Sequence, residues 1–214
     1  MNLKSSHVLP SDRRIEAAGS AHPRSASRAH WLDSRRLSLY SLAALACYAV
    51  FLAVYLYRVL WQQRADFPPL AMDFLPFWSA SFLAQHGHAV DAYNLKALTD
   101  VEMSAAPYFR TMGSILPWLY PPNSLLIMAP LALLPFQAAA VAFIAGTFAL
   151  FAKAIHSIVP RRQTLLVTLA FPGVALVALM GQNGMLTAAL AAVGLLVLRR
   201  RPAIAGICFG LLCM

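Results

Sequence analysis

One carboxylate stands out as a possible acid–base group. Asp73 comes directly before an aromatic run that begins Phe74 and includes Phe77. At a membrane surface such neighbours would partly desolvate the carboxylate and make it a stronger base. A base of this kind can receive the proton of an attacking hydroxyl. The alternative is structural, because Asp before an amphipathic run is a normal helix N-cap and Pro76 is tolerated in a first helical turn.

Two amides and a tyrosine are candidates for substrate binding. Gln182 and Asn183 lie between two glycines and could donate hydrogen bonds to a hydroxyl or phosphate oxygen. They could equally form a tight turn in which Gly181 ends one helix and Asn183 caps the next. Tyr120 could line the same cavity, or it could anchor the chain at the membrane interface ahead of two prolines.

The sequence gives little support for a metal or a cofactor. His86, His88 and Asp91 have a spacing that could hold a metal, but two histidines and one aspartate in a loop are more often solvated. We therefore assign no metal and no cofactor. The three cysteines all lie in apolar stretches, where cysteine behaves as a small hydrophobe.

The composition excludes a soluble protein. Of the 214 residues, 60% are hydrophobic and 12% are charged, against about 25% charged in a typical soluble domain. The apolar residues form uninterrupted blocks, which predicts an all-α polytopic membrane protein. Lys and Arg outnumber Asp and Glu by 17 to 8. Because these basic residues lie in the N-terminal region or beside apolar blocks, they indicate topology rather than a nucleic-acid partner.

The apolar blocks predict about four full spans plus a truncated fifth. Residues 1–36 read as a disordered, basic cytoplasmic tail. The acidic residues are concentrated in 61–121, which places that loop on the outer face. Its aromatic residues recur at helical spacing as far as Gly87, which predicts an interfacial helix. The predicted spans are 37–60, 136–157, 164–180 and 185–198, with an incomplete ascent over 203–214.

The block 122–158 has two possible arrangements. It is too long for one straight span, and Pro130 and Pro135 divide it. One arrangement is a partly inserted outer helix over 122–134 followed by a descending span. The other is a hairpin of two short spans that turns at Pro135. Arg161 and Arg162 belong on the inner face, which favours a single descending span.

Three motifs together resemble glycosyltransferase family 87, a family of the GT-C superfamily of polytopic sugar transferases. The resemblance covers about residue 37 to the end of the chain, and family members usually continue with further spans. The motifs are Asp73-Phe74 with Phe77-Trp78-Ser79-Ala80-Ser81, Gly87 and Tyr93; Tyr120-Pro121-Pro122 ahead of 129–135; and Gly181-Gln182-Asn183-Gly184 leading into 195–206.

The resemblance implies a GT-C-like helical bundle and an inverting transferase. Such an enzyme would move a hexosyl or pentosyl unit from a polyprenyl-phosphate donor to a lipid or glycan acceptor at the outer face of the plasma (inner) membrane. It also implies that Asp73 is the catalytic base. Tyr120, Gln182 and Asn183 remain the candidate substrate-binding residues. Residues 37–214 would be the membrane-embedded transferase domain, C-terminally incomplete, and the isolated chain is expected to be inactive.

Two other functions remain possible from the sequence. A transporter or channel component would place ionisable residues or broken helices at mid-membrane. Between Pro122 and Leu198 the ionisable side chains instead gather towards the inner face, at Lys153, His156, Arg161 and Arg162. A non-catalytic, truncated membrane protein is the third possibility, because the last apolar block stops after 12 residues.

Overall fold

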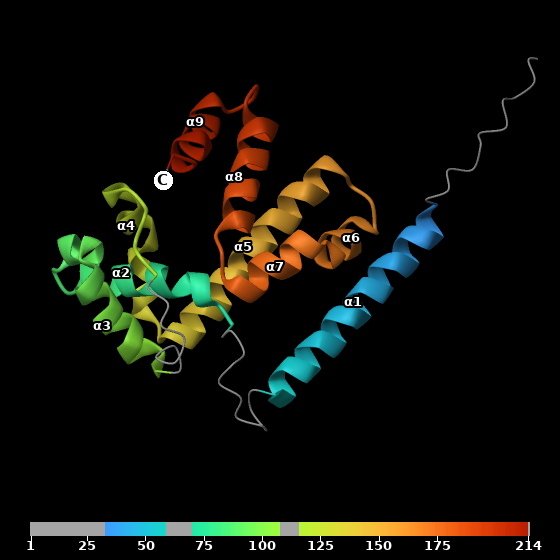
Figure 1. Cartoon of the computed structure of the whole chain (residues 1–214). Coiled ribbons are helices and arrows are strands. Elements are labelled where there is room, and N and C mark those ends of the chain that lie inside the picture. Colours follow the sequence, from blue (N-terminus) through green and yellow to red (C-terminus); the bar gives the residue numbers. More distant parts are fainter. Residues whose placement is uncertain (1–32, 59–69, 108–115, 214) are drawn as a thin grey trace, which may run out of the picture. The chain divides into compact units, whose positions relative to one another are not determined.

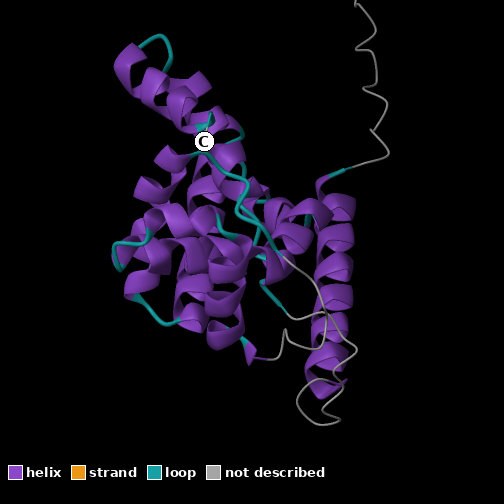
Figure 2. Ribbon diagram, turned by 60° about the vertical axis from the view of Figure 1, so that its left-hand side comes forward, coloured by secondary structure: helices purple, strands orange, loops and turns teal. Residues whose placement is uncertain are grey.

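The computed structural model describes residues 33–58, 70–107 and 116–213 (Figure 1). Residues 34–214 form one compact unit. The predicted tail therefore lies, up to residue 32, outside the described residues. Every regular element in the described part of the chain is helical (Figure 2), which confirms the all-α prediction.

Two helices are long and apolar enough to cross a bilayer. α1 (Ser34–Leu56) and α5 (Phe136–Ile158) each contain 23 residues, a length of about 35 Å against a hydrocarbon core of roughly 30 Å. α1 begins inside the predicted tail. It packs against α6 (Thr164–Ala170) and leaves most of its other apolar side chains exposed. By length and composition, these two helices are the candidate membrane spans of the described residues.

The segment 164–180, predicted as one ascending span, is divided into two short helices. α6 ends at Ala170, and α7 (Pro172–Met180) follows after Phe171, whose backbone is extended at φ −67° and ψ 124°. Pro172 causes the break, because it lacks an N–H and disfavours a helical conformation in the residue before it. Tyr48 of α1 donates its hydroxyl to the Ala170 carbonyl at 3.1 Å, which satisfies a carbonyl at the break.

The predicted number of full spans is not confirmed. The last two helices are α8 (Gly184–Val197) and α9 (Pro202–Leu211), with 14 and 10 residues. Their lengths are about 21 and 15 Å, less than the thickness of the hydrocarbon core. Among the described residues, only α1 and α5 have the length that a full span needs.

The block 122–158 divides where the two prolines predict. α4 (Pro122–Met128) continues into the 3₁₀ helix η5 (Ala129–Leu133), and α5 starts after Pro135. One helix of spanning length follows a shorter one. At the level of secondary structure this is the first of the two arrangements considered, not a hairpin of two short spans.

The predicted helix of the outer loop forms, but its surroundings differ from the prediction. The loop contains η2 (Met72–Phe74), α2 (Leu75–Gln85), η3 (Ala89–Tyr93) and α3 (Leu95–Ala105). α2 ends just before Gly87, whose φ is +82°, as predicted. Phe77 and Trp78 of α2 are buried against Phe143 and Phe136 of α5, so this aromatic face packs into the protein core.

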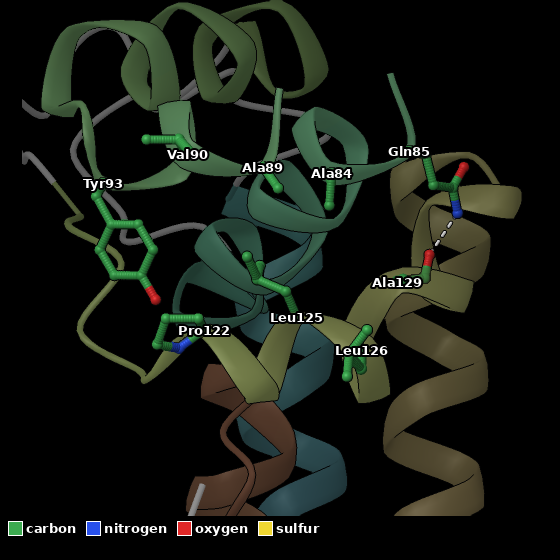
Figure 3. A pocket seen from close by; sticks show the side chains of 9 residues that line it. All are labelled: Ala84, Gln85, Ala89, Val90, Tyr93, Pro122, Leu125, Leu126 and Ala129. Atoms are coloured by element: carbon green, nitrogen blue, oxygen red, sulfur yellow. Dashed lines mark hydrogen bonds between the residues drawn. The ribbon is translucent and has the colours of Figure 1, made fainter. Parts of the chain in front are cut away.

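Three polar side chains of α2 hold it to the proline-interrupted segment. Trp78 Nε1 donates to the Leu134 carbonyl at 2.9 Å, and Ser81 Oγ donates to the Met128 carbonyl at 2.7 Å. Gln85 Nε2 donates to the Ala129 carbonyl (Figure 3). Residues three and four apart share one helix face. The three side chains therefore share one face of α2. They donate hydrogen bonds to carbonyl groups of a segment whose prolines prevent a regular helical hydrogen-bond pattern.

Candidate active site

The candidate site is built on two tight turns that are bonded to each other. Ala71 adopts a left-handed conformation (φ 57°, ψ 33°) and donates its N–H to the Leu179 carbonyl at 2.8 Å. Gly181 ends α7 with φ +74°. A Cβ at this glycine would lie 2.7 Å from Phe74 Cβ and 3.0 Å from Ala71 Cα. Only glycine allows the two turns to approach this closely.

Asp73 faces the second turn across this junction. Its Oδ2 accepts a hydrogen bond from Gln182 Nε2 at 2.6 Å, although the two residues are 109 positions apart in the sequence. Asp73 lies within η2, and the N-cap position of α2 is Phe74, with no side-chain capping bond. The alternative interpretation of Asp73 as the N-cap of this helix is therefore wrong.

Tyr120 lies against the same junction. Its ring centroid is 5.1 Å from those of both Phe77 and Trp118, and Tyr93 donates its hydroxyl to the Tyr120 carbonyl at 2.7 Å. Burial raises the pKa of the Tyr120 hydroxyl, a hydrogen bond with the Asn183 side chain lowers it, and the nearby negative charge of Asp73 raises it further. The net direction is upward, so this group stays a neutral phenol at physiological pH.

Asn183 occupies the N-cap position of α8 without acting as a cap. Its side chain makes no hydrogen bond to the first turn of the helix, and the residue lines the same cavity as Tyr120. The predicted turn, with Gly181 ending one helix, is confirmed. The alternative in which the Asn183 side chain caps the next helix is wrong, because that side chain makes no capping hydrogen bond.

All four candidate residues line one cavity of about 400 Å³. That volume lies within the range of small-ligand sites. The carboxylate, the amides and the phenol form its polar part, while proline, leucine and phenylalanine form the rest. The lining residues are Asp73, Pro76, Phe77, Leu116, Pro117, Leu119, Tyr120, Gln182 and Asn183.

A buried hydroxyl next to this cavity was not singled out in the sequence. Ser124 of α4 is 2% exposed, and its Oγ has no hydrogen-bond partner. It lines a second, mostly apolar cavity of about 80 Å³ that shares Tyr120 and Asn183 with the first. A lone serine in an apolar helix carries no distinguishing signal in a single sequence.

Of the three residues considered for a metal, His88 and Asp91 bond each other, and His86 bonds a backbone carbonyl. His86 Nδ1 lies 2.8 Å from the Phe82 carbonyl, and His88 Nδ1 lies 3.0 Å from Asp91 Oδ2. In the described ranges no group of three or more metal-ligating side chains could hold an ion.

Glu102 is a buried carboxyl group that the sequence did not mark. It lies on α3, is 2% exposed, and its Oε1 has no hydrogen-bond partner. Burial alone raises its pKa from the ordinary 4.5 to about 7, since a charged carboxylate is poorly solvated in the core. An acidic residue in a loop normally reads as solvated, so its burial appears only in the folded structure.

We predict that Glu102 makes the protein less stable as the pH rises. Between pH 4.5 and about 7 the folded chain keeps a proton that the unfolded chain releases. The free energy of unfolding therefore falls across this range, by roughly 2 to 3 kcal/mol at most. Thermal unfolding in detergent from pH 5 to 8 should show this loss, and Glu102→Gln should remove it. Asp100→Asn, an exposed change on the same helix, should leave it in place; an equal slope in Glu102→Gln would contradict the prediction.

Comparison with known proteins finds one family match, in the second part of the chain. Residues 118–214 match the model of glycosyltransferase family 87, which confirms the resemblance over these residues. No curated protein and no solved structure matches the chain. The matched residues include Tyr120, Gln182 and Asn183 but not Asp73. Together with α1 and α5, the match indicates a membrane glycosyltransferase in general.

Proposed function

From the family 87 match of residues 118–214, we propose that the protein transfers a hexosyl or pentosyl unit from a polyprenyl-phosphate donor. The acceptor is a lipid or a glycan at the outer face of the plasma (inner) membrane. One observation carries the proposal: Asp73, from outside the matched residues, is hydrogen-bonded to Gln182 inside them. A carboxylate is thereby present in a cavity whose other polar side chains, Tyr120, Gln182 and Asn183, belong to the matched segment.

The proposed reaction is an inverting displacement with Asp73 as the general base. The acceptor hydroxyl gives its proton to Asp73 as its oxygen bonds to the anomeric carbon. The bond from that carbon to the phosphate oxygen breaks, and polyprenyl phosphate leaves with the electron pair. Because attack comes from the side opposite the leaving group, the configuration at the anomeric carbon is inverted.

Tyr120 and Asn183 are the proposed substrate-binding groups. Their side chains lie at the boundary between the 400 Å³ cavity and the smaller apolar one. A neutral phenol and an amide can donate hydrogen bonds to sugar hydroxyls or phosphate oxygens. The leucine and proline side chains around them suit a donor whose carrier is a hydrocarbon chain.

The proposed orientation places the cavity outside and the N-terminus in the cytoplasm. Arg161 and Arg162 follow the end of α5, and the run 199–201 follows α8. Basic residues beside apolar helices are retained on the cytoplasmic side. The 181–183 turn lies at the start of α8, and the basic run 199–201 lies beyond its other end. The 71–74 turn packs against Gly181. Both turns are thus at the end of α8 away from the basic run, which supports an outer location for the site.

Sugar transfer by native membranes tests the proposal. Membranes from cells with the gene intact or deleted at its natural locus would receive radiolabelled polyprenyl-phosphate sugar or, in parallel, nucleotide sugar. We expect label to enter an acceptor from the lipid-linked donor only, to depend on the gene, and to carry the inverted anomeric configuration. Gene-dependent movement of label across the membrane without a new glycosidic bond would indicate a transporter and contradict the proposal.

A further inference from the structure

We infer that Gln182 is a positioning residue that orients the Asp73 carboxylate, rather than a residue that binds the substrate. This inference rests on the proposed function for the meaning of Asp73. It departs from the sequence-based prediction, in which Gln182 donates its hydrogen bond to a sugar or phosphate. The reason is that the Gln182 amide already has a partner, at 2.6 Å, within the protein.

The direction of this hydrogen bond follows from the chemistry of the two groups. An ionised carboxylate only accepts hydrogen bonds, so the amide must present its nitrogen. Gln182 Nε2 donates its hydrogen bond to Asp73 Oδ2. The other oxygen, Oδ1, has no hydrogen-bond partner in the described part of the chain. One oxygen is thus held, and the other remains available to receive a proton.

The backbone that carries the Gln182 side chain is held in place by hydrogen bonds of its own. The N–H groups of Gly181 and Gln182 both donate to the Val177 carbonyl, at 2.9 and 3.0 Å. This pattern, with a left-handed glycine, closes the C-terminus of α7 as in a Schellman-type turn. The Gln182 side chain therefore leaves from a rigid turn, although the side chain itself is exposed.

The backbone on the Asp73 side is fixed just as closely. Phe74 is fully buried, and its ring centroid lies 5.1 Å from that of Phe143 on α5. Ala71 is bonded to the Leu179 carbonyl at 2.8 Å. With both backbones held, one side-chain hydrogen bond suffices to select the carboxylate orientation. Small misplacements of a reacting group can lower a rate by about 10²-fold.

Kinetics of the natural protein separate positioning from binding. Gln182→Met keeps the approximate length of the side chain and removes the donor. We expect kcat to fall about 10- to 100-fold, with the KM values for donor and acceptor unchanged. Gln137→Met, an exposed change on α5, is the matched control and should alter neither constant. A raised KM with an unchanged kcat would show that Gln182 binds substrate and would overturn the inference.

A spectroscopic measurement tests the same contact without requiring turnover. In protein labelled with ¹³C-aspartate, Gln182→Met should shift one carboxylate band in the infrared spectrum, and this shift should vanish in the Asp73→Asn background. An absent shift overturns the positioning role. A shift in a protein that transfers no sugar would support the contact while refuting the proposed function, so the two failures are distinguishable.

Discussion

Asparagine in place of Asp73 is expected to lower the rate of sugar transfer by about 10²- to 10⁴-fold, the range that a general base contributes. An asparagine amide has nearly the shape of the carboxylate but cannot accept the acceptor's proton. The measurement is the initial rate of transfer from radiolabelled polyprenyl-phosphate sugar, in membranes from cells edited at the natural locus. Protein abundance and thermal unfolding should match the unmodified protein, because the Gln182 amide can turn to bond asparagine.

Asp100→Asn is the matched control for this prediction. Asp100 lies on α3, is exposed, and bonds Lys96 Nζ at 2.9 Å, so the same chemical change is made away from the cavity. Its replacement should leave the transfer rate unchanged. Normal turnover in Asp73→Asn would remove Asp73 as the base and leave the cavity without the carboxylate on which the proposed mechanism depends.

Alanine in place of Gly181 is expected to destabilise the protein by about 2 to 5 kcal/mol and to abolish transfer. The left-handed backbone at φ +74° costs a residue with a Cβ about 1 to 2 kcal/mol. In addition, the new Cβ would overlap Phe74 Cβ at 2.7 Å and Ala71 Cα at 3.0 Å, and overpacking typically adds about 1 to 3 kcal/mol. Thermal unfolding in detergent and the transfer rate are the measurements.

Two other glycines separate the causes of that loss. Gly87 has φ +82° but open space around the position of a Cβ, so Gly87→Ala should show only the backbone cost. Gly206, in α9, has open space and no positive φ, so its replacement should leave stability unchanged or slightly higher. If Gly181→Ala were no worse than Gly87→Ala, the close approach of the two turns would not contribute to stability.

Several local features could be predicted because their signals lie within a few residues. The aromatic spacing and Gly87 predict the helix that the structure shows as α2, and Pro135 predicts the start of α5. The glycine after Met180 predicts the turn that carries Gln182. Pro172 is an equally local signal, and it marks the break between α6 and α7 within the predicted span 164–180.

Other features could not be predicted because the partner group is distant. The spacing of Trp78, Ser81 and Gln85 is visible in the sequence, but nothing there shows that their partners are the carbonyls of 128–134. An aromatic helix in an outer loop is compatible with a membrane interface and with a protein core. Packing against α5 selects the core.

The sequence by itself determined the helical character, the two apolar helices of spanning length and the candidate residues, since hydropathy, proline and glycine act over short distances. Only the tertiary structure decided that Asp73, Tyr120, Gln182 and Asn183 share one cavity, and that Asp73 bonds Gln182 rather than capping α2. The physical reason is the close approach of the 71–74 turn to Gly181. That approach depends on burying Phe74 against α5, a contact between segments that no local pattern records.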